Sequence, residues 1–417
     1  MKFYIKKIHI ITNLLGFLIS GISGVAINIL IIRLYNSEVL GLFHQIIAIF
    51  FILSQITTFG VHLSVLSNIP TSDCKEIIFI SAFFTVLLVS ITSSLLLLVI
   101  IKYIFITFGF EDLSKALYFI IPSLVFFSLN KVMINTLNAQ SRLNLFAVAN
   151  SIRLTLMIIG ILLHYYFKWP VSEISSVLIF SESVIFLFLI TTHLNYFVVK
   201  TSYLEIYHWS KAHISFGKYA LFSGLIIELN TKIDIIILSI FVDQRSIGIY
   251  SFAATLGEGF YLLISIFKNL NSSNASNQLL DTSDKKLSQN REDDMKNILI
   301  FIYSIGFISI LAYQLFAWLA TGDKLIVVKG FWVYVVYATT LILSAKYLLI
   351  DNILILANKP HLDNKVRLWS LLSNLLLSIV LVPLYGIYGA VLALAFSVLV
   401  NALLLKYFYL KFNLNST

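Results

Sequence analysis

Nine ionisable side chains lie within the long apolar stretches of this 417-residue chain: Lys131, Arg153, Glu182, Glu228, Lys232, Asp234, Glu258, Lys346 and Asp351. A single charge at the centre of a bilayer costs about 2.5–3.5 kcal/mol on insertion scales, so nine of them facing lipid would cost on the order of 20–30 kcal/mol. This penalty excludes lipid exposure for the whole set. We therefore expect these side chains to face one another or a water-filled lumen that several helices share.

The basic members of this set predict an anionic ligand. Arginine binds phosphate oxygens as a two-pronged fork, and lysine binds them as a point charge. The candidates for a cationic lumen that binds substrate are Arg153, Lys232, Lys346 and Lys131. Lys131 is the weaker candidate, because it lies near the inner end of its stretch and its long side chain can reach the cytoplasm.

The acidic members suit a different task, because acidic side chains within a membrane often carry protons or bind a coupling cation. The candidates for ion coupling are Glu182, Glu228, Glu258 and Asp351. Glu228 and Lys232 are four residues apart and share a helix face. They form either a neutral pair within the bundle or part of a transport site, and the sequence leaves both open. Asp234 lies roughly 200° around the helix from Lys232 and points elsewhere.

The elements that must hold these residues are transmembrane helices. Of all residues, 59% are hydrophobic and only 12% are charged, whereas a soluble domain has roughly 25% charged residues. A membrane protein satisfies its backbone in helices or in a closed barrel, and the long continuous apolar runs here lack the alternation of a barrel. We predict an all-α integral membrane protein with about 12 spans, at residues 9–32, 43–66, 77–101, 116–137, 144–166, 174–197, 217–241, 249–270, 297–320, 331–356, 367–384 and 386–405.

The distribution of basic residues predicts that both termini lie in the cytoplasm. In that orientation 18 of the 29 Lys and Arg residues fall in cytoplasmic segments and 7 in outer segments, as expected from the positive-inside rule. The spans divide into two six-helix bundles. The first occupies residues 1–200, and the second begins with two spans in 201–270. It continues with four spans in 297–405, before a cytoplasmic tail at 406–417. The polar stretch 271–296 predicts a flexible cytoplasmic linker loop.

Two short motifs indicate that the two bundles are repeats. Residues 34–43 read LYNSEVLGLF and residues 241–250 read FVDQRSIGIY, with Gly41 and Gly248 in register. Each motif lies at the outer end of the first hairpin of its half. Two six-helix halves of the same topology form a parallel repeat, which is a common transporter plan with the substrate site at the interface. Convergence of tight outer turns on polar residues and glycine is the alternative explanation.

Signatures of enzymes and metal sites are missing from the sequence. It contains no GxxxxGK[ST] phosphate loop, no HExxH and no GxSxG, the motifs of common nucleotide-binding and hydrolytic sites. The single cysteine, Cys74, and eight unclustered histidines give no metal-ligand set. The net charge of +9 is spread over loop ends, so it does not indicate a nucleic-acid partner. We expect a protein that is not an enzyme and uses no cofactor or metal.

Three segments carry a family resemblance: residues 33–43, residues 234–241 together with 246–253, and residues 374–390. They resemble the Wzx-type O-antigen and polysaccharide flippases of the multidrug/oligosaccharidyl-lipid/polysaccharide (MOP) exporter superfamily. The resemblance implies two six-helix bundles that form a V around a central cavity and work by ion-gradient-driven alternating access. It implies export of an oligosaccharide repeat unit on undecaprenyl pyrophosphate, from the inner to the outer leaflet of a bacterial inner membrane.

The resemblance also implies the partners of the protein. They are the lipid-linked oligosaccharide, a coupling proton or sodium ion, membrane lipids and, within lipopolysaccharide biosynthesis, a polysaccharide polymerase and a chain-length regulator. Two other functions stay open. A multidrug exporter of the same superfamily needs an acidic lumen for organic cations, whereas acids and bases are nearly balanced here. A polytopic membrane glycosyltransferase usually carries catalytic residues on a large outer loop, and the longest outer segment here, 102–115, is short.

Overall fold

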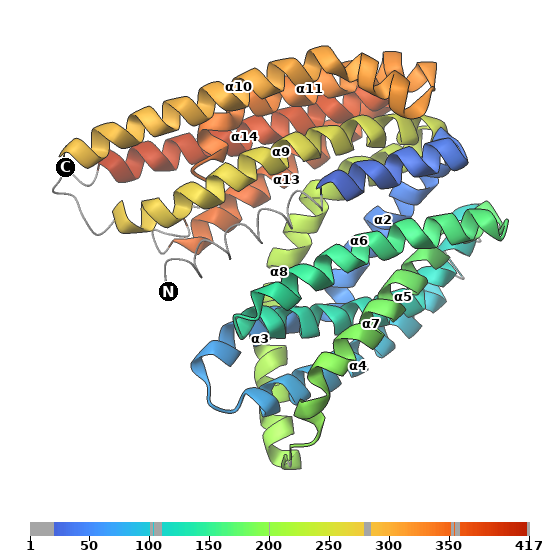
Figure 1. Ribbon diagram of the computed structural model, residues 1–417, viewed down its shortest axis with the longest axis vertical. Helices are drawn as coiled ribbons and strands as arrows, with labels where there is room; N and C mark the ends of the chain where they lie inside the picture. Colours follow the sequence, from blue (N-terminus) through green and yellow to red (C-terminus); the bar gives the residue numbers. More distant parts are fainter. Residues whose placement is uncertain are drawn as a thin grey trace. The chain divides into compact units, whose positions relative to one another are not determined.

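The computed structural model describes residues 21–100, 103, 111–199, 201–278, 285–351, 354 and 359–414. These residues are 92% helical and contain no strand, which confirms the predicted all-α class. Helical residues Gly21–Leu34 come first. The elements that follow are α2 (Ser37–Thr58), α3 (Val61–Asn68), η1 (Ile69–Thr71), α4 (Lys75–Ile100), α5 (Glu111–Ala139), α6 (Leu143–Tyr166), η3 (Val171–Glu173), α7 (Ser176–Phe197), α8 (Tyr203–Phe241), α9 (Gln244–Gln278), α10 (Lys285–Thr321), α11 (Lys324–Leu348), α13 (Pro360–Tyr385) and α14 (Ile387–Leu414) (Figure 1).

The chain is a multi-pass membrane protein. Ten helices in the described part are long and apolar enough to cross a membrane, namely α2, α4, α5, α6, α7, α9, α10, α11, α13 and α14. Two further helices complete the twelve predicted spans. The apolar stretch of α8 is long enough but carries Glu228, Lys232 and Asp234. Gly21–Leu34 is a shorter apolar helix that overlaps the first predicted span, whose residues 9–20 lie outside the described residues.

Several predicted boundaries differ from the structure, among them span 43–66, which the break at Gly60 divides between α2 and α3. The stretch 271–296 was expected to be a loop, but α9 continues to Gln278 and α10 starts at Lys285, while residues 279–284 lie outside the described part. A polar sequence is compatible with a helix that extends beyond the bilayer, so the polarity of residues 271–278 and 285–296 did not correctly predict a loop. α11 ends at Leu348 rather than near residue 356. The predicted span was too long because apolar residues also follow Leu348, and hydropathy alone does not show where a helix ends.

The described residues form two compact units. Unit 1 comprises the described parts of Met1–Leu34 and Leu42–Glu228, and unit 2 comprises Tyr35–Gly41 with the described parts of Leu229–Thr417. The sequence predicted a boundary at residue 200, but the boundary falls after Glu228, within the uninterrupted helix α8. Helix α2 is divided in the same way, after Gly41.

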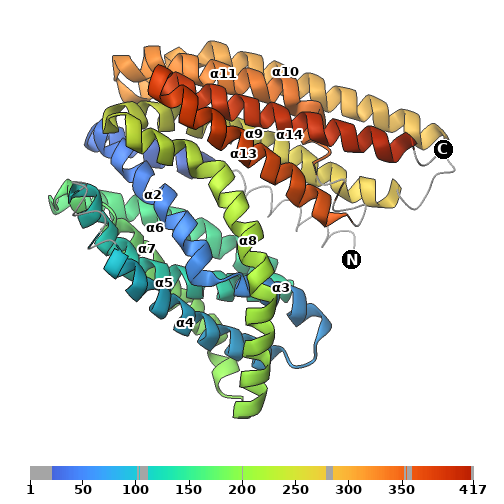
Figure 2. The ribbon, with the colours of Figure 1, turned by 180° about the vertical axis from the view of Figure 1, so that it is seen from behind.

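Unit 1 is built around α5, which packs against α3, α4 and α7, while α6 packs against α7 (Figure 2). An apolar core between these helices includes Phe79 of α4, Met133 of α5 and Ile185 of α7. The helical backbone is interrupted between α2 and α3 at Gly60. The φ of Gly60 is +67°, a left-handed conformation that glycine adopts without strain. A Cβ at Gly60 would lie 2.9 Å from the carbonyl oxygen of Gly217, so α8 packs here at backbone distance.

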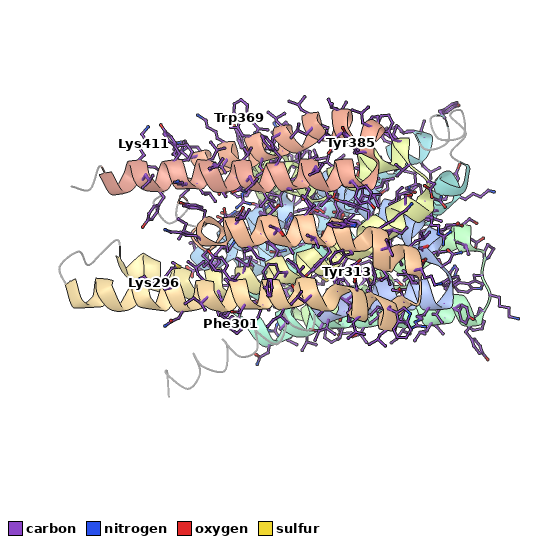
Figure 3. All side chains as sticks on the ribbon, turned by 90° about the horizontal axis from the view of Figure 1, so that it is seen from above. Lys296, Phe301, Tyr313, Trp369, Tyr385 and Lys411 are labelled. Carbon is purple, nitrogen blue, oxygen red and sulfur yellow. The ribbon has the colours of Figure 1, made fainter. Side chains whose placement is uncertain are left out.

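Unit 2 packs α11 against α9, α10 and α14, and packs α13 against α14. Gly386, with φ +55°, makes the turn between α13 and α14, which falls between the predicted spans 367–384 and 386–405. Figure 3 shows Lys296 of α10 and Lys411 of α14 at one end of these helices and Tyr385 at the other. The two lysines therefore share one end of the unit, as expected for residues on the same side of a membrane.

Candidate functional site

The two predicted repeat motifs meet within unit 2. A Cβ at Gly41 would lie 1.9 Å from the carbonyl oxygen of Gln244, and a Cβ at Gly248 would lie 1.9 Å from the carbonyl oxygen of Ser37. The contact is reciprocal, because each glycine faces the residue four positions before the other glycine. Only glycine lets two helix backbones approach so closely. This equivalence favours the repeat over chance convergence of two turns.

The helices that start at these motifs are also capped in the same way. Asn36 Oδ1 accepts a hydrogen bond of 2.9 Å from the amide of Val39 at the start of α2. Asp243 Oδ2 accepts one of 3.2 Å from the amide of Ser246 at the start of α9. Burial acts to raise the pKa of Asp243, but hydrogen bonds from the Ser246 hydroxyl and amide outweigh it, and the pKa lies below its ordinary value.

A third helix start joins the two motifs. Asp323 caps α11 by accepting a hydrogen bond of 2.8 Å from the amide of Leu325. Its other oxygen, Oδ2, accepts one of 3.2 Å from the hydroxyl of Ser37 and lies 3.8 Å from Nη2 of Arg245. A carboxylate is favourable at the positive ends of helices. Asp323 thereby ties α2, α9 and α11 together in unit 2.

In unit 1, Arg153 of α6 and Glu182 of α7 form an ion pair. Arg153 Nε lies 2.9 Å from Glu182 Oε1, and Nη2 donates to Oε2 at 3.3 Å. The Glu182 side chain is 2% exposed and the Arg153 side chain 19%. Asn130 of α5 donates from Nδ2 to Oε2 and to the backbone carbonyl of Glu182, each at 2.9 Å. One predicted substrate-binding residue and one predicted coupling residue thus lie together.

Lys131 of α5 joins this pair around the ring of Phe127. The Arg153 guanidinium carbon lies 4.8 Å from the ring centroid and Lys131 Nζ lies 5.7 Å from it, distances at which a cation is attracted to an aromatic face. Lys131 also interacts electrostatically with Glu228, and Glu228 accepts a hydrogen bond of 3.1 Å from Gln55 Nε2 of α2. We call Phe127 and the residues linked through these interactions, namely Asn130, Lys131, Arg153, Glu182 and Glu228, the Phe127 cluster.

In unit 2, Lys232 of α8 faces Glu258 of α9, with 3.6 Å between Nζ and Oε1. The Lys232 side chain is 17% exposed and the Glu258 side chain 48%. The sequence suggested Glu228 as the partner of Lys232, and that pairing stays a prediction. Asp234 is buried and accepts hydrogen bonds from its neighbour's amide and from the hydroxyl of Tyr250. The sequence assigned no role to Asp234, because Tyr250 comes close only in the folded protein.

The last two predicted residues lie near a helix end rather than deep in a span. Lys346 is exposed in the last turn of α11, and Asp351 follows that helix. Asp351 Oδ2 lies 3.2 Å from Lys268 Nζ and 3.5 Å from Arg367 Nη2. Arg367 Nε also lies 2.9 Å from Asp363 Oδ2. This network could not be predicted from the sequence, because its members come from α9, α13 and the segment between α11 and α13.

Metal-binding geometry is absent from the part of the chain that the structure describes: no group of three His, Cys, Asp or Glu side chains there could hold an ion. The predicted site residues lie in or near the Phe127 cluster in unit 1, and the Lys232–Glu258 pair and the Asp351 network in unit 2. Of the eight predicted site residues, the Phe127 cluster brings four together: Lys131, Arg153, Glu182 and Glu228.

No protein-family model and no curated protein sequence matches this chain. Solved structures do match it. The lipid II flippase MurJ in an inward closed conformation aligns with a TM-score of 0.76 at 17% identity, over 96% of this chain and 87% of that chain. An inward-facing multidrug resistance MATE family transporter of the MOP superfamily aligns with a TM-score of 0.69 at 13% identity, over 94% of each chain.

A third solved structure is a MOP superfamily transporter from Pyrococcus furiosus, whose binding pocket is described as having reversed polarity that suggests a different function. It aligns with a TM-score of 0.55 at 15% identity, over 95% of this chain and 94% of that chain. These likenesses extend over nearly the whole chain, and all three proteins are transporters or flippases. The chain has the fold of MOP superfamily transporters, which confirms the predicted fold class.

Proposed function

We propose that this protein is a flippase that moves an oligosaccharide repeat unit on undecaprenyl pyrophosphate from the inner to the outer leaflet of a bacterial inner membrane. The observation that carries the proposal is the Phe127 cluster, in which Lys131 and Arg153 lie against one aromatic ring. Two cations held within membrane-spanning helices suit a ligand with several negative oxygens, such as a pyrophosphate. A lysine and an arginine together provide both a point charge and a fork for such oxygens.

The fold and the absence of known enzyme motifs support transport without chemical change. The chain shares its fold with a lipid II flippase and with MATE transporters, and it contains no GxxxxGK[ST] phosphate loop. We infer that an ion gradient drives alternating access. The excess of basic residues in the predicted inner segments supports a cytoplasmic position for both termini. A polymerase and a chain-length regulator of the same polysaccharide pathway would act on the exported lipid.

Multidrug export is the second candidate function, and one observation favours it. Glu258 in unit 2 is 48% exposed and lies 3.6 Å from its cationic partner Lys232, so part of its carboxylate surface remains accessible to an organic cation. The fold is equally compatible with this function, because MATE transporters share it. The two proposals make opposite demands on charge. A flippase depends on Lys131 and Arg153, whereas a drug exporter depends on Glu258.

Complementation distinguishes these functions. The chain would be expressed in a bacterial strain that lacks its own repeat-unit flippase, and surface polysaccharide would be measured. Each charge-assisted hydrogen bond contributes about 1.5–3 kcal/mol, so we expect Arg153→Ala and Lys131→Ala to reduce export about tenfold or more. Lys406→Ala, an exposed lysine near the end of α14, is the matched control and should export normally. Wild-type levels from both variants, or drug resistance lost in Glu258→Gln alone, would overturn the flippase proposal.

A further inference from the structure

We propose that Glu182 is an exchangeable counter-ion of the substrate site, which takes up a proton when an anionic headgroup binds to Arg153. The inference rests on the function proposed above and assigns Glu182 to substrate binding instead of energy coupling. It concerns one ion pair in unit 1. The alternative is that the Arg153–Glu182 pair only neutralises two charges within the bundle and stays intact throughout transport.

The geometry of the pair places Glu182 where a phosphate would bind. Arg153 Nη2 donates a hydrogen bond of 3.3 Å to Glu182 Oε2, while Nε lies 2.9 Å from Oε1 as an ion-pair contact that lacks the geometry of a hydrogen bond. This is the edge of the guanidinium that matches the paired oxygens of a carboxylate or a phosphate. A headgroup that uses this edge must displace the Glu182 carboxylate. The displacement is a substitution of one oxyanion by another and needs no change in the arginine.

The charge balance of the cluster explains why a proton must arrive with the anion. Lys131 and Arg153 carry two positive charges, and Glu182 and Glu228 carry two negative charges when ionised. A neutral cluster gives a headgroup no net attraction. A displaced Glu182 carboxylate that is 2% exposed would be a buried charge without its cation, which is strongly unfavourable. A proton on Glu182 removes this charge and leaves the cluster with a net positive charge for the headgroup.

Asn130 is positioned to stabilise Glu182 with or without its proton. Asn130 is fully buried, and its Nδ2 donates to the Glu182 carboxylate. Its Oδ1 has no hydrogen-bond partner among the described residues, although it is buried. An amide side chain carries donors on one side and an acceptor on the other. Rotation of the Asn130 amide by half a turn would therefore let Oδ1 accept a hydrogen bond from protonated Glu182.

Other charges around Glu182 do not replace this role. The helices that pack against α7 are α4, α5 and α6. α6 contributes Arg153, and α5 contributes Lys131 through the Phe127 ring. α4 carries charge only in its first turn, at Lys75 and Glu76. Arg153 is thus the direct cationic partner of Glu182, and loss of Arg153 to a substrate leaves protonation as the remaining route to neutrality.

This assignment changes which of the predicted acidic residues couple transport to an ion gradient. A proton that binds with the headgroup leaves with the headgroup, in the same direction. It cannot draw energy from a gradient that drives protons inward. Glu182 therefore sets affinity for the anion, and energy coupling falls to the remaining acidic candidates, Glu228, Glu258 and Asp351.

Calorimetry of the full-length protein in lipid nanodiscs tests the proposal. Farnesyl diphosphate is the lipid probe and inorganic pyrophosphate is the free-anion probe. Titrations in two buffers with different heats of ionisation give both affinity and the number of protons taken up, between pH 6 and pH 8. The variants are Glu182→Gln, Arg153→Ala and, as a control acid in unit 2, Glu38→Gln, which replaces an exposed glutamate. Because all proteins bind the same probe, protonation of the probe itself cancels in the comparison.

We expect the wild type and Glu38→Gln to take up about one proton more per bound anion than Glu182→Gln does. Coupling between two ligands of one site typically changes affinity 5–150-fold, so Glu182→Gln should bind about tenfold tighter at pH 8. Arg153→Ala should weaken binding. Binding of farnesyl diphosphate alone would support the proposal with a lipid-linked headgroup as the ligand, and binding of both probes would support it with the phosphates sufficient.

Three outcomes overturn the proposal. Equal proton uptake by the wild type and Glu182→Gln would show that the pair is structural, and would leave the flippase proposal standing. Binding that Arg153→Ala does not weaken would place the anion elsewhere. Failure of both probes to bind to the wild type and to Glu182→Gln would overturn the flippase proposal together with this inference.

Discussion

Substitution of Gly41 by alanine should destabilise unit 2, because the site has no room for a Cβ. The new carbon would lie 1.9 Å from the carbonyl oxygen of Gln244 and 3.0 Å from the amide nitrogen of Gly248. Both neighbours are backbone atoms of α9, so neither can rotate away as a side chain would. The starts of α2 and α9 must therefore move apart by roughly 1 Å or more to reach an ordinary contact distance.

The size of the effect follows from two opposing terms. Overpacking of this kind typically costs about 1–3 kcal/mol, whereas replacing glycine by alanine within a helix contributes about 0.5–1 kcal/mol of stability. We expect a net loss of about 1–2 kcal/mol for Gly41→Ala, and a similar loss for Gly248→Ala, because the two contacts are reciprocal. One separation of the helices relieves both clashes, so the double variant should lose less than the sum of the two single variants.

Thermal unfolding of the purified protein in one detergent measures these differences. Gly259→Ala, in the same helix α9, is the matched control because a Cβ there meets no atom within 4 Å. The control should unfold at the wild-type temperature or slightly above it. If Gly41→Ala unfolds at the same temperature as Gly259→Ala, the close crossing of the two motifs is refuted. If the losses in the double variant simply add, the two glycines do not share one contact.

Two further substitutions test the charged clusters and the helix caps. Asp351→Ala leaves Lys268 and Arg367 without their shared carboxylate, so we expect a loss of about 2–3 kcal/mol, discounted for partial exposure of both cations; an unchanged melting temperature would contradict the network. Asp243→Ala removes the cap of α9 and should cost about 1 kcal/mol, which the same measurement detects. Because the pKa of Asp243 is lowered on folding, its contribution is present above the ordinary aspartate pKa and is lost as pH falls through the lower, folded-state pKa. The difference between Asp243→Ala and wild type should therefore persist at neutral pH and vanish in strong acid.

The parts of the fold that could be predicted are those with a local signal in the sequence. Hydropathy located α6 and α7 within a few residues, because each is a continuous apolar run with polar ends. The repeat was visible because two glycines stand at equivalent places in similar motifs. The end of α11 could not be predicted in the same way, since an apolar run continues after Leu348 whether or not the helix does.

The site was only partly predictable, because intramembrane charge says which residues need partners but not which partners they find. The cost of burial identified Arg153 and Glu182 as residues that avoid lipid. Their pairing, and the place of Phe127 between Arg153 and Lys131, depend on how α5, α6 and α7 pack. Asp234 was set aside for the same reason, since its partner Tyr250 is on the next helix.

The division of α2 between the two units has a consequence for synthesis of the protein. Residues Tyr35–Gly41 belong to unit 2, yet Ser37 and its hydrogen-bond partner Asp323 are 286 residues apart in the chain. At about 5–20 residues per second, a ribosome needs on the order of 15–60 s to make that stretch. During this time the first turn of α2 is already in the membrane without its native neighbours. Residues Tyr35–Gly41 are thus the first part of unit 2 to be synthesised and among the last to form their native contacts. They must stay in the membrane without these contacts until α9 and α11 have been synthesised.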